Sequence, residues 1–200
     1  MKCIATLSTA AIILFGNLSV NAQRIKVQQG DPSVIKTESS INIEFTYDKV
    51  SVGKYSNEKD YISKKTEEYN SKDPGRGDIW AKNWINDRQA RYEPKFIDLF
   101  TITSHVTISK NAKYTLIFKT KSIEPGYNIG GGMIGFGGRK NAEIDAEVWI
   151  VETDNRDKKL AVMTVENAPG GTWGGYDYDT GTRIAESYAI SGKKLAKFIY

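Results

Sequence analysis

The side chains that could carry catalytic chemistry are few, and they set the first limits on function. His105 is the only histidine in the 200 residues, and Cys3 is the only cysteine. Every Ser-His-Asp or Cys-His device would therefore depend on one of these two residues. The pattern around His105 places it beside Thr103 and Thr107 on the polar face of an expected strand. This favours a structural or surface histidine, and we expect no catalytic residue.

Carboxylates are the remaining candidates for acid–base chemistry or for a metal site. Glu143, Asp145 and Glu147 alternate along one expected strand, which places neighbouring side chains on one face about 7 Å apart. Such a pair can act as general acid and base, or can hold Ca²⁺ or Mg²⁺. Three lysines lie on a comparable polar face of the preceding expected strand: Lys113, Lys119 and Lys121. Cross-strand ion pairs explain both sets, and we expect neither a metal ion nor a cofactor.

Glycine is concentrated in two segments that also carry apolar and aromatic side chains. Residues 126–138 hold seven of the 18 glycines, and residues 170–181 hold five. The first segment contains a GxGxxG pattern, but a dinucleotide site needs a helix after it and a strand pattern follows here. Apolar side chains on such a loop favour cover by a partner, a ligand or a lipid surface. Aromatic rings beside carboxylates suit sugars or cationic ligands.

These two segments supply the predicted binding residues. The candidates are Tyr127, Ile129, Met133, Ile134, Phe136, Trp173, Tyr176, Asp177 and Tyr178. Both segments also have simpler interpretations: the first can fold over its own sheet edge, and the second can be a tight connection with Trp173 packed inward. The acidic pairs Glu143 and Asp145, or Asp177 and Asp179, keep a carboxylate-based hydrolase as an alternative function. A further alternative is an oligomeric envelope scaffold or a pore-associated subunit.

Residues 1–22 have the pattern of a secretory signal peptide. Lys2 precedes an apolar stretch over residues 4–15, and a polar exit with small residues ends at Ala22. We expect cleavage after Ala22 and export to the periplasm or the outer surface, with an uncleaved membrane anchor as the alternative. Cys3 lies before the apolar stretch rather than after it, so we do not expect a lipoprotein.

Composition and charge bound the class of protein. The chain is 40% hydrophobic and 26% charged, as globular proteins are. Its net charge is +4 without a block of Lys or Arg, so nucleic acid is not the expected partner. After the leader no segment approaches 18 apolar residues, and no further membrane-spanning helix is expected. We expect a polar N-terminal arm over residues 23–40 and a single α+β domain over residues 41–200.

Hydrophobic periodicity predicts the elements that position the candidate residues. Alternating patterns predict five strands, over 41–47, 101–109, 113–122, 142–153 and 160–166, with a hairpin turn over 154–158. Because four of these strands follow one another, the pattern favours a mainly antiparallel sheet with two or three helices packed on one face.

Three helical patterns accompany the strands. The first covers residues 57–70, and the second is capped by Asp78, carries Trp80 and Trp84, and is kinked near Glu93 by the following proline. The third is the C-terminal helix, which we expect Thr182 to cap. Its apolar stripe consists of Ile184, Tyr188, Leu195 and Ile199.

The C-terminal third of the chain resembles known envelope proteins. The hairpin AEVWIVET–turn–LAVMTVE within residues 142–166 leads through glycines to RIAESYAISGKKLAKFI over residues 183–199. This layout resembles uncharacterised exported envelope proteins and lipoproteins of Gram-negative bacteria. It is more distantly similar to the α/β domains of the curli-secretion channel and of the TolB N-terminal region. The resemblance implies an α/β sandwich in the envelope with an assembly role, and it supplies no catalytic residue.

Together these observations predict an exported, non-catalytic envelope protein. We expect it to bind a protein, a glycan or a membrane surface through its glycine and aromatic loops, and a homo-oligomer is compatible with that role.

Overall fold

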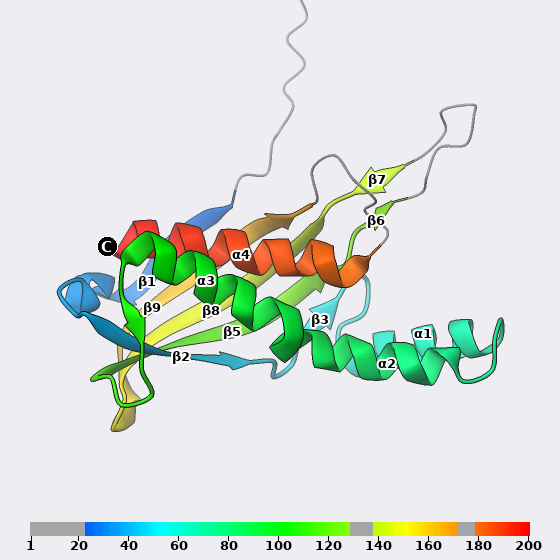
Figure 1. Ribbon diagram of the computed structural model, residues 1–200, viewed down its shortest axis with the longest axis horizontal. Helices are drawn as coiled ribbons and strands as arrows, with labels where there is room; N and C mark the ends of the chain where they lie inside the picture. The colour runs from blue at the N-terminus through cyan, green and yellow to red at the C-terminus, as the bar shows by residue number, and fades with distance from the viewer. Residues whose placement is uncertain (1–22, 129–137, 172–178) are drawn as a thin grey trace, which may run out of the picture.

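The computed structural model describes residues 23–128, 138–171 and 179–200, in which helices cover one face of a seven-stranded mixed sheet (Figure 1). The strand order is β1-β9-β8-β5-β2-β4, and β3 pairs with the end of β5. The sheet strands are β1 (Arg24–Gly30), β2 (Ser40–Thr46), β3 (Ser51–Val52), β4 (Thr107–Ile108), β5 (Tyr114–Glu124), β8 (Ala142–Glu152) and β9 (Asn155–Gly170). A separate two-stranded ribbon consists of β6 (Tyr127–Asn128) and β7 (Arg139–Lys140). The expected α+β class is confirmed.

The antiparallel half of the sheet follows the predicted alternation. Strands β5, β8 and β9 pair in sequence, and β9 also pairs with β1. Along β8 the side chains of Ile144, Val148 and Ile150 are fully buried in the core, while Glu143 and Trp149 point to the other face. The period-two pattern therefore assigns the two faces of β8 correctly.

The other half of the sheet is parallel, which corrects the expectation of a mainly antiparallel sheet of about five strands. Strand β2 runs parallel to both β5 and β4, and Ile43 lies opposite Leu116. Three helices separate β2 from β5 along the chain, and a crossover of this length returns the chain in the same direction.

Two segments differ from their expected structure. The predicted strand over 101–109 is helical as far as Ser104, and only Thr107–Ile108 pair as β4. Phe96 and Phe100 are fully buried one helical turn apart, so packing extends the helix into a run of β-branched residues. The segment 23–40, expected as a loosely held arm, contains β1 and a short 3₁₀ helix, Pro32–Ile35.

The described α-helices belong to three continuous helical segments. Helix α1 (Glu58–Asn70) begins at Asn57, whose side chain accepts from the Asp60 amide. Helix α2 (Arg76–Asp87) continues through a π-helical segment (Arg88–Tyr92) into α3 (Glu93–Ser104), which places the expected kink near Glu93 in a π-turn. Helix α4 (Thr180–Ile199) is capped by Asp179 rather than Thr182, and Gly75 rather than Asp78 precedes α2.

Helices α3 and α4 lie side by side over the sheet, whereas the α1–α2 hairpin extends beyond the sheet's edge (Figure 1). The predicted stripe of α4, including Tyr188 and Leu195, is buried. Gly192 permits the close approach of the two helices, because a Cβ there would lie 2.3 Å from the Phe96 carbonyl oxygen. The main core therefore fixes the position of α3, and with it the C-terminal end of α2.

We predict that Gly192→Ala destabilises the fold. Alanine favours a helix by about 1 kcal/mol over glycine, but overpacking against backbone costs about 1–3 kcal/mol, so a net loss is expected. Chemical denaturation followed by circular dichroism measures the free energy of unfolding. Lys193→Ala, at the exposed neighbouring position, is the control and should change it by less than about 0.5 kcal/mol. An unchanged stability for Gly192→Ala would contradict the packing described.

Candidate functional site

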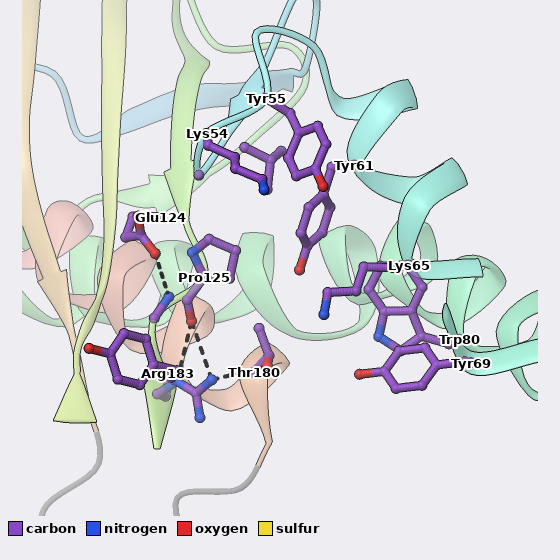
Figure 2. Close-up of a pocket in the computed structure, with 14 residues that line it drawn as sticks. Lys54, Tyr55, Tyr61, Lys65, Tyr69, Trp80, Glu124, Pro125, Thr180 and Arg183 are labelled. Carbon is purple, nitrogen blue, oxygen red and sulfur yellow. Dashed lines mark hydrogen bonds between the residues drawn. The ribbon is translucent and has the colours of Figure 1, made fainter. Parts of the chain in front are cut away.

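A cavity of about 580 Å³ lies between the α1–α2 hairpin and the end of the sheet where β3 and β5 finish (Figure 2). We call it the aromatic pocket, because five aromatic side chains line it: Tyr55, Tyr61, Tyr69, Trp80 and Tyr127. Its size falls within the range of small-molecule sites, roughly 300–1,000 Å³. The described residues lining it come from α1, α2, α4, the turn after β3, and the end of β5.

One wall of the aromatic pocket is a stripe along α1. Tyr61, Lys65 and Tyr69 are spaced four residues apart and so lie on one helix face. Trp80 of α2 packs across this stripe, with its ring centroid 5.8 Å from that of Tyr61 and 5.6 Å from that of Tyr69. Tyr61 is 8% exposed, whereas Tyr69 and Trp80 are half-buried. The rings of Tyr69 and Trp80 therefore keep surface available to a ligand.

The two helices of this wall are held together by a carboxylate and by a glycine. Glu58 accepts a 2.8 Å hydrogen bond from the Trp84 indole nitrogen and pairs through its other oxygen with Arg88. A Cβ at Gly77 would lie 2.1 Å from the Thr66 carbonyl oxygen, so glycine is needed where α2 crosses α1. These contacts fix the orientation of the ring stripe.

The second wall is a tight turn after β3. Val52 and Tyr55 exchange two backbone hydrogen bonds of 2.9 Å each, and Gly53 between them has φ +54°. The Gly53 amide also donates to the Ile123 carbonyl, 2.9 Å away, which ties the turn to β5. Lys54 and Tyr55 are thereby placed at the rim, and the Lys54 ammonium points toward the space in front of Tyr61 (Figure 2).

The third wall joins the end of β5 to the first turn of α4. Arg183 is 3% exposed and donates to the Pro125 carbonyl oxygen at 3.3 Å and to the Thr180 hydroxyl at 3.0 Å. Glu124 pairs with Lys140 at 2.7 Å. These bonds keep the wall polar but internally paired.

The described side chains that line this pocket are mainly rings, hydroxyls and cations. Burial, above all, raises the pKa of the Tyr61 phenol well above its ordinary value, and the charges of neighbouring Tyr69 and Glu124 act in the same direction. Its hydroxyl is therefore a neutral hydrogen-bond donor at physiological pH. Glu124 is the one carboxylate among the described lining residues, and no histidine or cysteine accompanies it.

Of the nine predicted binding residues, only Tyr127 lies within the described ranges. It lines the aromatic pocket and is 47% exposed. Ile129, Met133, Ile134, Phe136, Trp173, Tyr176, Asp177 and Tyr178 lie outside the described residues, and their roles stay predictions. The leader over 1–22 also lies outside them. Described residues of both glycine segments line the pocket: Gly126 and Tyr127 of residues 126–138, and Thr180 of residues 170–181.

The acidic stripe on β8 is engaged in other contacts. Asp145 accepts from the Ser122 hydroxyl at 2.7 Å and from the Asn167 amide at 2.8 Å. Burial raises the pKa of Glu143, and the charge of Asp145 adds to the shift. Glu147 accepts from the Trp149 indole on its own strand.

The expected ladder of ion pairs on this face is wrong for the described part of the chain. No ion pair there joins the three β8 acids to the three lysines on β5 or next to it. Lys119 lies opposite Glu147 in register, but its ammonium sits 3.9 Å from the Trp149 ring centroid. Lys113 lies over the Tyr114 ring instead.

The remaining candidates also have structural roles. Asp179 caps α4 and pairs with Arg91, which borders a second cavity of about 530 Å³. His105 is exposed and ends α3 in a left-handed conformation with φ +61°. Over the described ranges, no cluster of three or more His, Cys, Asp or Glu side chains is arranged to hold a metal ion. None of the described helices combines the length and apolarity needed to cross a bilayer.

Sequence reasoning missed most of the pocket. The helical pattern over residues 57–70 includes Tyr61 and Tyr69, and the next pattern includes Trp80, but these patterns assign a binding role to none of them and none to Lys54 or Lys65. The four-residue spacing of Tyr61, Lys65 and Tyr69 was the available signal. What the spacing does not contain is the turn after β3, which supplies the facing wall.

Comparisons with known proteins add little. No family model matches the chain, and no curated protein matches it. Among solved structures, the PelC dodecamer from Paraburkholderia phytofirmans aligns with a TM-score of 0.33 and 9% identity, covering 84% of this chain and 96% of that one. A variant of the same dodecamer aligns with a TM-score of 0.33 and 11% identity, covering 84% and 97%. Likeness at this level carries no argument about fold or function.

We predict that Glu58→Ala destabilises the protein by about 2 kcal/mol, because it removes a charge-assisted hydrogen bond and leaves the Arg88 charge unpaired. Denaturant titration followed by tryptophan fluorescence measures the loss. Glu67→Ala is the matched control on the same helix: the Glu67 side chain is 68% exposed and that of Glu58 is 14% exposed. Its surface pair with Lys64 contributes less than about 1 kcal/mol. Equal losses in both variants would contradict this account of the hairpin.

Proposed function

We propose that the protein is an exported, non-catalytic binding protein of the bacterial envelope whose aromatic pocket takes a glycan. The observation that carries the proposal is the pair of half-buried rings of Tyr69 and Trp80, which line a cavity of ligand size. Aromatic rings with a polar edge bury the apolar face of a ligand while their N–H and O–H groups bond its hydroxyls. A sugar presents both kinds of surface.

The pocket's inventory favours binding over turnover. Hydrolysis of a glycosidic bond uses two carboxyl groups on either side of the bond. The described lining residues include Glu124 alone, and Glu124 is paired with Lys140. Of the acids of the hydrolase alternative, Glu143 and Asp145 line neither of the two cavities described above, and Asp145 already accepts two hydrogen bonds. Asp179 lines the second cavity, where it pairs with Arg91, and Asp177 lies outside the described residues.

The position of the pocket also supports the proposal. The two glycine segments are predicted to carry the binding residues, and each contributes described residues to the aromatic pocket. A ligand seated against Tyr127 and Thr180 would thus contact both predicted segments. The expected leader over residues 1–22 would deliver such a protein to a compartment that contains glycans.

We predict that Trp80→Ala weakens glycan binding at least tenfold, the equivalent of about 1.4 kcal/mol. Isothermal titration of the purified protein against a panel of soluble neutral and acidic polysaccharides measures the affinity. Tyr69→Ala removes the neighbouring ring and should weaken binding in the same direction. Circular dichroism melting identifies any variant that has lost its fold.

Trp149→Ala is the matched control, because Trp149 lies on the opposite face of the sheet between Lys119 and Lys159. Its affinity should equal that of the unchanged protein. Absence of binding across the whole panel, or a loss with Trp149→Ala but not with Trp80→Ala, would refute the proposal.

A further inference from the structure

We infer that the aromatic pocket selects acidic glycans, and that Lys54 and Lys65 are the residues that distinguish a negatively charged sugar from a neutral one. The inference rests on the proposed function and names the ligand class of the same site. It is argued from the charges around the pocket and from the way each lysine is held.

Cationic groups outnumber carboxylates in the aromatic pocket. Among the described lining residues, Lys54, Lys65 and Arg183 are cationic and Glu124 is acidic. The Glu124 carboxylate lies 2.7 Å from the ammonium of Lys140, which does not line the pocket. Its charge is therefore balanced from outside, and the ammonium groups of Lys54 and Lys65 supply positive charge that favours an anion.

Lys54 is a cation whose backbone is held in place and which has no carboxylate partner among the described residues. The closed turn between Val52 and Tyr55 fixes its backbone, as described above. Over the described ranges its ammonium makes no ion pair. The ammonium lies over the Tyr55 ring, 5.5 Å from the ring centroid. A cation placed at the rim of a cavity without a counter-charge is suited to pairing with a charged ligand.

Lys65 has a carboxylate partner that it shares. Its ammonium lies 2.9 Å from one oxygen of Glu68, while Lys72 lies 3.3 Å from the other. If Lys65 turns toward a ligand, Glu68 keeps Lys72 as a partner. The Lys65 side chain extends from α1 into the space opposite Arg183 and Thr180 (Figure 2), so only its outer part needs to move.

Arg183 adds a fixed positive charge at the back of the pocket. Its guanidinium is held by the Pro125 carbonyl oxygen and the Thr180 hydroxyl. A sugar ring packed on Trp80 and Tyr69 would lie beside the Lys65 ammonium, which sits 5.7 Å from the Tyr69 ring centroid, in a pocket that Lys54 and Arg183 also line. A carboxylate or sulfate on that ring would gain attraction that a hydroxyl would not.

The test compares ligands that differ only in charge. Titration calorimetry measures binding of oligogalacturonides and of their methyl esters, which are neutral at the same positions. A second pair, dextran sulfate and dextran, separates sulfate from carboxylate recognition. The proteins are the unchanged chain, Lys54→Gln, Lys65→Gln, and the double variant. Lys64→Gln is the matched control, because Lys64 neighbours Lys65 on α1, pairs with Glu67 and does not line the pocket.

We expect tighter binding of at least one acidic ligand than of its neutral counterpart, by about tenfold or more, with a preference that falls as salt rises from about 0.05 to about 0.5 M. Each single variant should lose about fivefold in affinity for the acidic ligand, and the double variant should lose the preference altogether. In each pocket variant the loss should be larger for the acidic ligand than for its neutral counterpart, Lys64→Gln should bind both as the unchanged chain does, and circular dichroism melting shows that the fold is intact.

The other outcomes distinguish a failure of the charge preference from a failure of glycan binding itself. Equal binding of acidic and neutral ligands overturns this inference and leaves the proposed function standing. An acidic preference that survives in the double variant overturns the assignment to Lys54 and Lys65. No binding of any of the four ligands, by a protein that also fails the wider panel, overturns both.

Discussion

The contact between α3 and α4 is the constraint on which the rest of the molecule depends. Gly192 of α4 lets the backbone of Phe96 approach closely, and the side chains of Phe96 and Phe100 on α3 are fully buried. The Phe96 ring lies 4.8 Å from that of Phe118 on β5, so the same contact links helix to strand. Helix α2, the π-helical segment and α3 form one continuous helical rod. The packing that fixes α3 therefore also sets the direction of α2. Trp80 thus takes its place in the aromatic pocket from packing that occurs more than a dozen residues away along the chain.

The π-helical segment over Arg88–Tyr92 adapts that rod to two different surroundings. One extra residue in a helical turn rotates the faces that follow by about 100° relative to those before it. At the end of the π-helical segment, Tyr92 stacks on Tyr188 of α4, with ring centroids 5.2 Å apart. Before the segment, Trp84 faces Glu58 of α1, and Arg88, the first residue of the segment, reaches both Glu58 and the Tyr47 ring. A regular helix would direct one of these two faces away from its partner, so the π-turn allows a single rod to serve the core and the hairpin.

Elements with one buried apolar face and one exposed polar face could be predicted from the sequence. Elements whose position depends on backbone hydrogen bonds between strands could not. The stripe of α4 and the alternation of β8 were predicted because each presents one apolar face to the core. Strand β1 was missed because it is an edge strand: its side chains are mostly exposed, and its hydrogen bonds to β9 leave no periodic signal. The parallel pairing of β2 with β5 is a property of the crossover, which side-chain alternation does not encode. The pocket was missed for a related reason. Lys54 and Trp80 come from separate segments that only the fold brings together.

The side chains of the main core and those that line the pocket differ in how far they can be substituted without loss of the fold. The phenylalanines of α3 and the stripe of α4 are fully buried, so substitutions there are felt by the whole sheet. Tyr69 and Trp80 instead pack within a hairpin that extends past the sheet, and they keep part of their ring surface exposed. Lys54 projects from a turn whose geometry depends on Gly53 and on backbone bonds, not on the lysine itself. Side chains that decide what the pocket accepts can therefore vary with little effect on the fold, whereas the glycines and the Glu58 carboxylate that position them cannot.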